Sequence, residues 1–391
     1  MHKHLMNTYS RLPVAFRYGR GCRLYDTEGR EYLDGLSGIA VSTLGYNHPR
    51  LSSELSRQVS DLIHCSNIYQ IEKQEELART LCAISGLQEV FFCNSGCEAN
   101  EAAIKIARLY GHSKGIEAPT IIVMEQAFHG RTMATLSATG NRKVQAGFEP
   151  LVGGFARVPY KDLAAVEAAA VNNPNVVAVM LEIIQGEGGI NIASPEYVRG
   201  LHALCQQNDW LLICDEVQCG TGRTGRWFGF QHAEVIPDIV TLAKGLGSGV
   251  PIGACLTAGK SAGLCAPGNH GSTFGGNPLA CTAALTTIDV IEQEDLIAHA
   301  ERLGEVISNG LNLGLADVAQ VVDIRGMGLM IGIELEKPCG SLVKQALDAG
   351  LLINVTANKV VRLLPPLIIS EAEALELVRR LSELIKRHLE N

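Results

Sequence analysis

Residues 241–246 read Thr-Leu-Ala-Lys-Gly-Leu, and they follow the apolar residues Ile239 and Val240. The composition is that of a buried strand that ends at Lys244, with small residues beyond it. Burying an ammonium group is costly, so a lysine inside a protein usually has a task. Desolvation lowers the pKa of such a lysine and frees its amine to attack carbonyl groups. The alternative is a lysine that reaches solvent from a strand end, which is the commoner case for an isolated lysine.

Apolar runs and amphipathic helix patterns alternate on both sides of this stretch. Strand-like runs cover 89–92, 121–124, 176–181, 211–216, 239–242 and 252–257, and helix patterns cover 49–62, 70–84, 161–171 and 195–208. Strands that are apolar throughout and alternate with helices indicate an α/β protein whose sheet is parallel and covered on both faces. Ligands of such sheets bind at the carboxyl ends of the strands.

The pattern of predicted helices and strands changes after about residue 290. Helix patterns at 296–313 and 370–385 flank strand-like runs at 321–335 and 360–367, and Ser370-Glu371-Ala372-Glu373 has the sequence of a capping box. A hairpin turn is predicted at 26–29. We therefore expect a large domain over residues 46–288, a smaller α/β domain over 289–391, and an N-terminal segment, 1–45, that packs with the smaller domain.

Composition argues against several kinds of partner. The chain has 391 residues and a net charge of -8 without any block of basic residues, so neither nucleic acid nor an anionic membrane surface is an expected partner. No apolar run reaches bilayer length, and residues 1–4 lead into no signal peptide, so we expect a cytoplasmic protein. The twelve cysteines are scattered, without CxxC spacing or a histidine cluster, which indicates reduced thiols and no metal site.

A second unusual segment follows the strand-like run at 89–92. It reads Cys93-Asn94-Ser95-Gly96-Cys97 and leads into a helix pattern. A turn of small residues before a helix exposes backbone N–H groups, which together with the helix dipole bind anions such as phosphate. An ordinary capped helix is an equal alternative. A Walker loop is excluded because no GK[ST] follows.

Asp215 ends another apolar run, where a carboxylate is costly unless it meets a positive partner. Taken alone, it is best explained by a structural salt bridge. Together, Lys244, Asp215 and the turn at 96–97 supply an amine for an aldehyde, an acid for a protonated pyridine nitrogen, and N–H groups for a phosphate. These are the partners that pyridoxal phosphate requires.

Five motifs resemble, in the same order, those of the class III (ω-amino) aminotransferases among the fold-type I pyridoxal-phosphate enzymes. They are Asn94-Ser95-Gly96-Cys97-Glu98-Ala99-Asn100, Phe128-His129-Gly130-Arg131-Thr132, Asp215-Glu216-Val217-Gln218, Lys244, and Gly271-Ser272-Thr273-Phe274-Gly275-Gly276-Asn277-Pro278. The likeness runs from about Tyr9 to the C-terminal helix. It implies the fold of a fold-type I transferase, with a mostly parallel central sheet in the large domain and a smaller α/β domain, pyridoxal 5'-phosphate as cofactor, and aminotransferase activity.

The resemblance also implies which residues bind the cofactor phosphate. Ser95, Gly96 and Cys97 match the phosphate-binding turn, although alanine or threonine is more usual where Cys97 stands. Thr273 matches a phosphate ligand that reaches in from the other subunit. A homodimer is therefore expected.

Four residues match the contacts to the cofactor ring and its aldehyde. Phe128 matches the aromatic residue that stacks on the pyridine ring. Asp215 matches the partner of the ring nitrogen, and Gln218 the residue beside the phenolic oxygen. Lys244 matches the catalytic lysine, which bonds the cofactor and then moves a proton as general base and acid.

Substrate contacts are implied for another four residues. Arg131 matches the arginine that holds the carboxylate of the amino donor, and Arg362 the one that holds the α-carboxylate of 2-oxoglutarate, because a guanidinium fork suits both. Glu187 matches a carboxylate that neutralises the second arginine in some members, and Ser272 is a further substrate contact. Surface ion pairs for the arginines and a plain turn for Glu187 are the structural alternatives.

Within the family, the chain most resembles members that act on N-acetylornithine. Residues 9–14 and 44–49 carry this likeness, and Ile39 stands where members acting on free ornithine resemble one another in having tyrosine. The expected reaction transfers the terminal amine of N2-acetylornithine to 2-oxoglutarate, giving N-acetylglutamate 5-semialdehyde and glutamate, a step of arginine biosynthesis. Succinylornithine, succinyldiaminopimelate, 4-aminobutyrate and ornithine are alternative donors.

Other classes of function explain fewer of these residues. A pyridoxal-phosphate aminomutase or racemase would use Lys244 but leave Arg362 and Glu187 without a task. A nicotinamide dehydrogenase is disfavoured because no GxGxxG lies between a strand and a helix near the start of the chain. A binding protein with a relic site is disfavoured because every residue that matches the catalytic set is present.

Overall fold

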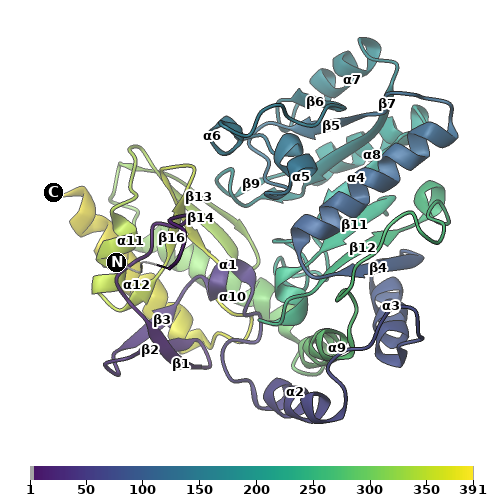
Figure 1. The fold of residues 1–391 in the computed structure, drawn as a ribbon. Helices are drawn as coiled ribbons and strands as arrows, with labels where there is room; N and C mark the ends of the chain where they lie inside the picture. Colours follow the sequence, from purple (N-terminus) through teal and green to yellow (C-terminus); the bar gives the residue numbers. More distant parts are fainter. Residues whose placement is uncertain (1–3, 391) are drawn as a thin grey trace.

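The computed structural model describes residues 4–390, and its largest element is a seven-stranded sheet (Figure 1). The strand order is β4-β12-β11-β10-β7-β5-β6. These strands are β4 (Glu89–Cys93), β5 (Thr120–Met124), β6 (Phe155–Val158), β7 (Val176–Glu182), β10 (Leu211–Asp215), β11 (Ile239–Leu242) and β12 (Gly253–Thr257). The mostly parallel sheet predicted from the sequence is confirmed, because only β12 runs against its two neighbours.

The reversed direction of β12 departs from the all-parallel pattern that the alternation of strands and helices suggests. Residues 243–252 join β11 to β12, and this connection contains one short 3-10 turn, Lys244–Gly247. A parallel pair needs a crossover of about a dozen or more residues, usually with a helix. The short connection therefore returns the chain antiparallel, and it holds Lys244 at the end of β11.

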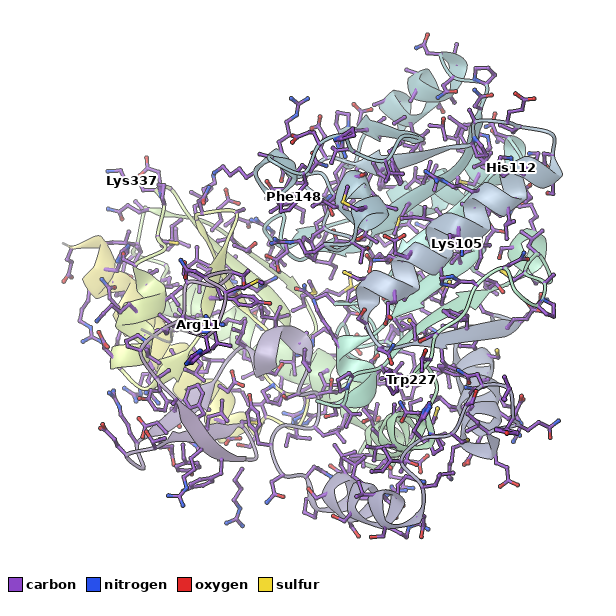
Figure 2. All side chains as sticks on the ribbon, viewed as in Figure 1. Arg11, Lys105, His112, Phe148, Trp227 and Lys337 are labelled. Carbon is purple, nitrogen blue, oxygen red and sulfur yellow. The ribbon has the colours of Figure 1, made fainter. Side chains whose placement is uncertain are left out.

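Alternate residues of the central strands pack on opposite faces of the sheet. Ile213 and Ile239 share a buried cluster with α4 (Gly96–Ser113), on which Lys105 and His112 are labelled in Figure 2. Leu212 and Val240 belong to a second cluster, which includes residues of α8 (Pro195–Gln207). Strands buried on both faces read as continuous apolar runs, which is why the sequence predicts them well.

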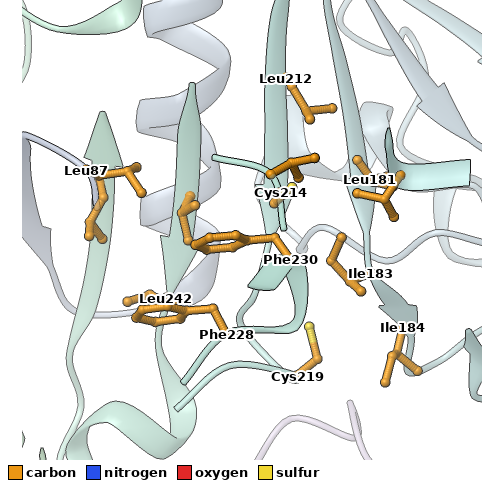
Figure 3. Close-up of a cluster of buried hydrophobic side chains, with 14 of the residues drawn as sticks. Leu87, Leu181, Ile183, Ile184, Leu212, Cys214, Cys219, Phe228, Phe230 and Leu242 are labelled. Carbon is orange, nitrogen blue, oxygen red and sulfur yellow. The ribbon is translucent and has the colours of Figure 1, made fainter. Parts of the chain in front are cut away.

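An aromatic pair closes the second cluster near the carboxyl end of β10. The rings of Phe228 and Phe230 lie 5.5 Å apart and nearly parallel, among Leu212, Cys214 and Leu242 (Figure 3). Offset stacking of this kind adds to the burial of the two rings. The strand that ends at Asp215 therefore packs against a buried apolar cluster.

The C-terminal part contains a four-stranded sheet with the order β13-β14-β17-β16. Its strands are β13 (Val321–Met327), β14 (Met330–Leu335), β16 (Asn354–Thr356) and β17 (Val360–Leu363). Helices α10 (Leu296–Gly314) and α12 (Glu371–Leu389) share a buried apolar cluster with it. The capping box is confirmed, because Ser370 Oγ accepts from Glu373 N and Glu373 Oε2 accepts from Ser370 N.

The N-terminal strands join this C-terminal part. The hairpin of β2 (Arg23–Asp26) and β3 (Glu31–Asp34) is as predicted, β1 (Phe16–Arg20) pairs with β2, and β3 pairs in parallel with β15 (Leu351–Leu352). Figure 1 shows this sheet beside α12, far from β5 and β6. The domain boundaries at residues 45 and 288 stay predictions.

One long helix is not predicted by the sequence patterns above. α9 (Pro278–Gln293) is buried along most of its length, so it lacks the polar face that marks an amphipathic helix. Asn277 directly before it is the N-cap, and its Oδ1 accepts from Ala280 N at 2.9 Å. The remaining elements are α1 (Ser37–Ala40), α2 (Pro49–Asp61), α3 (Glu72–Ser85), α5 (Met133–Ala138), α6 (Arg142–Gln145), α7 (Leu163–Val171), β8 (Ile184–Gln185), β9 (Asn191–Ile192) and α11 (Leu342–Asp348), with 3-10 turns at Gly229–Ala233 and Gly259–Ser261.

Candidate active site

A cavity of about 350 Å³ lies at the carboxyl ends of the parallel strands. We call it the inner cavity. Segments that follow β4, β5, β10 and β11 line it, together with the end of β7. Of the residues predicted to bind the cofactor, it brings together Ser95, Gly96, Cys97, Phe128, Asp215, Gln218 and Lys244.

Lys244 lies two residues after the end of the short β11 strand and lines the inner cavity. Its φ of 43° lies in the left-handed region, where a residue with a Cβ is strained. Burial lowers the pKa of its amine, the nearby Arg362 guanidinium lowers it further, and Glu187 and Asp215 oppose the shift. The result is an amine that loses its proton more readily than a surface lysine.

Three donors fix the position of the Asp215 side chain. Its Oδ2 accepts from Asn100 Nδ2 at 2.7 Å and from His129 Nδ1 at 2.8 Å, and its Oδ1 accepts from Val217 N at 3.0 Å. The Asp215 side chain is 3% exposed. His129 is buried too, and its Nε2 has no hydrogen-bond partner within residues 4–390.

Asn100 and His129 are site residues whose roles the sequence patterns do not predict. Asn100 lies one helical turn after Gly96 on α4, and its Oδ1 also accepts from Thr241 Oγ1 at 2.7 Å. Spacing of four residues on a helix puts two side chains on one face. That spacing, with the strand end before the helix, is the signal that points to Asn100.

Glu182 is a second buried carboxyl that sequence reasoning misses. It ends β7, and its oxygens accept from Phe128 N at 2.8 Å and Gly186 N at 3.2 Å. Burial raises the pKa of this carboxyl to about 7, with a contribution from Asp215 that His129 opposes. The position directly after an apolar strand is the same signal that singles out Asp215.

The amino end of α4 forms one end of the inner cavity. Ser95 caps the helix, because its Oγ accepts from Glu98 N at 3.2 Å. A Cβ on Gly96 would lie 2.7 Å from Val217 Cγ1, so only glycine fits there. Cys97 Sγ accepts from Arg131 N at 3.1 Å, which ties this turn to the loop after β5. Free N–H groups of an 18-residue helix therefore face the cavity end.

Arg362 is fully buried on β17 and reaches the loops of the large sheet. Its Nη1 donates to Glu187 Oε1 at 2.7 Å and to Gln218 Oε1 at 3.0 Å, and its Nε donates to Asn354 Oδ1 at 3.0 Å. Nη2 has no partner within the described residues. The Glu187 side chain is 40% exposed, so this ion pair meets solvent on its carboxylate side.

A larger cavity of about 1130 Å³ adjoins the inner one, since Phe128 lines both. This outer cavity lies between the loops after β5 and β8 and residues of the C-terminal sheet. Arg131 lines it, with its guanidinium carbon 5.6 Å from the centroid of the Phe128 ring. Glu187 lines it as well.

Two predicted site residues, Thr273 and Ser272, lie apart from the residues described above. Thr273 is exposed and lines neither cavity. Ser272 lines neither cavity either, but its Oγ accepts from Asn94 Nδ2 at 3.2 Å. Within one chain, therefore, Thr273 is not brought to the other predicted site residues.

The sequence matches the model of the class-III aminotransferase family over residues 5–385. The chain belongs to the class-III aminotransferases. Acetylornithine aminotransferase from Nitrosomonas europaea is 60% identical over 388 residues, which cover 99% of each protein. Acetylornithine aminotransferase 1 from Bordetella bronchiseptica is 54% identical over 389 residues, which cover 100% of this chain and 99% of that protein.

Solved structures share the fold of this class-III aminotransferase. The ornithine aminotransferase of Toxoplasma gondii superposes with a TM-score of 0.95 at 34% identity, covering 99% of this chain and 94% of that one. Acetylornithine aminotransferase from Elizabethkingia anophelis has a TM-score of 0.88 at 33% identity, covering 98% and 97%. The fold-type I transferase fold predicted from the sequence is confirmed.

Metal-ligand clusters and membrane spans are absent from the described part of this aminotransferase. Between residues 4 and 390, no three histidine, cysteine or acidic side chains gather as metal ligands, and no helix is long and apolar enough to cross a membrane. All twelve cysteines are free thiols.

Proposed function

We propose that this aminotransferase moves the terminal amine of N-acetylornithine to 2-oxoglutarate, with pyridoxal 5'-phosphate as its cofactor. The observation that carries the proposal is 60% identity to an acetylornithine aminotransferase over 99% of both chains. The products are N-acetylglutamate 5-semialdehyde and glutamate, as expected for a step of arginine biosynthesis.

The residues of the inner cavity fit this cofactor. The N–H groups at Ser95–Cys97 would bind its phosphate, and the absence of a Cβ at Gly96 leaves room for the close packing of Val217. Asp215, held by three donors, would pair with the protonated ring nitrogen. Phe128 and Gln218, which line the same cavity, would contact the ring face and the phenolic oxygen. Pyridoxal phosphate supplies an electron sink for the substrate carbon that carries the amine.

Lys244 performs the proton transfers. Because burial and Arg362 lower its pKa, its amine gives up its proton more readily than that of a surface lysine, as a general base requires. With pyridoxal phosphate bound, the Lys244 amine would hold its aldehyde, and during the reaction the same amine would carry the proton that leaves the substrate carbon. The apolar walls of the inner cavity, such as Val217 and Ile252, limit the access of water.

Two arginines bind the carboxylates of the two substrates, one arginine for each substrate. Arg131 in the outer cavity binds the carboxylate of N-acetylornithine, whose terminal amine then reaches the inner cavity. Arg362 binds the α-carboxylate of 2-oxoglutarate, and the contact of 2.7 Å to Glu187 supports a carboxylate that covers Arg362 during the first half-reaction. An uncovered buried guanidinium would otherwise be costly. Ser272 is a further substrate contact in this proposal.

The assembly belongs to the same proposal. Thr273 completes the phosphate site of the partner subunit in a homodimer, which its exposure in the single chain supports. Phe274 next to it is 60% exposed, and Ile68 and Tyr69 are 80% and 67% exposed. Large apolar side chains left in water are typical of a surface that a second subunit covers. A cytoplasmic location stays a prediction.

Ornithine is the alternative donor that a specific finding favours, since a Toxoplasma gondii ornithine aminotransferase shares the fold at a TM-score of 0.95. Ile39, at a φ of 68° in α1, argues against it, because an aliphatic side chain cannot hydrogen-bond the free α-amino acid end. The identity to that protein is also lower, 34% against 60%.

The proposal is tested by mixing the purified holoenzyme with N-acetylornithine and 2-oxoglutarate and measuring glutamate. We expect sustained glutamate formation that is lost in Lys244→Ala. Reduction with borohydride, followed by peptide mapping, places the cofactor on the peptide that contains Lys244. Label on another lysine, or no glutamate from N-acetylornithine, contradicts the proposal.

A further inference from the structure

The outer cavity carries more positive than negative charge. Five cationic side chains line it, Arg131, Arg142, Lys143, Arg325 and Lys359, against the two carboxylates Glu187 and Glu334. This excess is unusual because the whole chain has a net charge of -8. The excess of positive charge is therefore local to the outer cavity, which Phe128 also lines.

Ion pairs neutralise the cations on the C-terminal side of this cavity. Arg325 pairs with Asp323 at 2.8 Å and with Glu334 at 2.7 Å, and Lys359 pairs with Glu334 at 2.7 Å. Glu187 is engaged by Arg362. Both carboxylates that line the outer cavity therefore already have cationic partners.

The cations on the large-sheet side have no such partners. Across residues 4–390, no ion pair involves Arg131, Arg142 or Lys143. Arg131 has a place in the proposed reaction as the contact for the donor carboxylate. Arg142 and Lys143 have none, although both are exposed on the cavity rim.

The segment that bears these two cations is held in place. They lie on the short helix α6 (Arg142–Gln145), which Figure 1 shows at the edge of the large-sheet part that faces β13 and β16. Gln145 Nε2 donates to Leu136 O at 3.0 Å and Thr139 O at 2.7 Å, and Asn141 Oδ1 accepts from Lys143 N at 3.0 Å. The backbone of α6 is therefore fixed while its two cationic side chains reach solvent.

We propose that Arg142 and Lys143 form a cationic entrance that attracts dicarboxylate keto acids to the outer cavity and so favours a dianionic acceptor over a monoanionic one. The inference rests on the proposed function, because it takes 2-oxoglutarate as the acceptor. A rim lined by one sign of charge raises the local concentration of ions of the opposite sign and speeds their association.

The two substrates of the reaction respond differently to such an entrance. 2-Oxoglutarate carries two carboxylates and no amine, whereas N-acetylornithine carries one carboxylate and one ammonium group and has no net charge. Long-range attraction therefore acts on the acceptor and leaves the donor nearly unaffected. The second carboxylate of the acceptor gains from the rim without any direct hydrogen bond, because charges interact over several ångströms in low salt.

The test compares the double variant Arg142→Gln/Lys143→Gln with a matched control, Arg199→Gln/Lys386→Gln. The control lowers the net charge equally, at two surface cations that line neither cavity. Glutarate, an unreactive dicarboxylate, is titrated into the holoenzyme by calorimetry. The ionic strengths are about 0.01 M and about 1 M, where the screening length is roughly 30 Å and roughly 3 Å.

At low ionic strength we expect the double variant to bind glutarate about fivefold more weakly than the wild type, and at high ionic strength the difference falls below about twofold. kcat/KM for 2-oxoglutarate falls by the same factor. The rate with 2-oxopentanoate, which has the same carbon chain and no distal carboxylate, falls less. The half-reaction with N-acetylornithine and the control variant keep wild-type values.

Equal glutarate affinities of the wild type and the double variant at low ionic strength overturn the inference. An equal loss in the control variant also overturns it, because net charge alone would then explain the effect. If N-acetylornithine fails as a donor while glutarate and 2-oxoglutarate show the expected losses, the proposed donor is wrong and the cationic entrance stands.

Discussion

Glu187→Gln tests how one site accepts two different carboxylates. In the structure, Glu187 Oε1 lies 2.7 Å from Nη1 of the fully buried Arg362. Glutamine keeps the shape and a carbonyl acceptor but removes the charge. A donor with an α-carboxylate, such as glutamate, must displace Glu187 to reach Arg362, whereas in the variant it displaces a neutral amide.

The size of the effect follows from burial. Breaking a fully buried ion pair costs about 3–5 kcal/mol, and an exposed pair contributes about 0–1 kcal/mol. This pair joins an arginine with no exposed surface to a carboxylate that is 40% exposed, so an intermediate value of about 1.5 kcal/mol applies. Arg362 also keeps its bonds to Gln218 and Asn354. We expect glutamate to gain about tenfold in kcat/KM as a donor.

Single-turnover kinetics measure this change. The holoenzyme is mixed with glutamate or with N-acetylornithine, and the cofactor absorbance follows each half-reaction. Glu334→Gln is the matched control, because it removes a carboxylate from the same cavity that pairs with Arg325 and Lys359 rather than Arg362. A glutamate rate that stays unchanged in Glu187→Gln, or rises as much in Glu334→Gln, refutes the reasoning.

Three further predictions concern the residues around Arg362 and Lys244. Asp215→Asn removes the charge opposite the ring nitrogen, so kcat falls by about 10²–10³-fold with cofactor still bound, as measured by steady-state rates and absorbance. Arg362→Ala slows the half-reaction with 2-oxoglutarate more than the half-reaction with N-acetylornithine. Arg131→Ala mainly raises the KM for N-acetylornithine. Stopped-flow measurements of both half-reactions in each variant distinguish these effects. The pKa of Lys244 is lower in the folded protein than in the unfolded chain. At pH values between that lowered pKa and the ordinary lysine value of about 10.4, the unfolded chain therefore binds more protons than the folded protein. The stability of the cofactor-free wild type relative to Lys244→Met therefore rises as the pH approaches that value, which urea unfolding at a series of pH values measures.

The sequence predicts the parts of the site that depend on local pattern. Lys244 and Asp215 follow apolar runs, and the carboxyl ends of parallel strands meet at one edge of a sheet, so their proximity follows from topology. The turn at 95–97 is recognisable because a strand, small residues and a helix follow one another. The structure places all of these residues around one cavity.

Pattern does not predict contacts between distant segments. Nothing in the strand ending at Glu182 shows that its carboxyl accepts from Phe128 N, 54 residues earlier. The hydrogen bonds from Asn100 on α4 and His129 after β5 to Asp215 at the end of β10 likewise join segments far apart in the sequence. The direction of β12 is not predictable because an apolar run has the same pattern in both directions. α9 is not predicted because it is buried on most sides and has no amphipathic pattern.

The most direct test of the central claim is a panel of amino donors with 2-oxoglutarate as acceptor, scored by initial rate. The panel contains N-acetylornithine, ornithine, succinylornithine, succinyldiaminopimelate and 4-aminobutyrate. We predict that N-acetylornithine has the highest kcat/KM and exceeds ornithine by at least about tenfold, the value of one lost polar contact of about 1.4 kcal/mol. A higher kcat/KM for ornithine or 4-aminobutyrate than for N-acetylornithine would contradict the account.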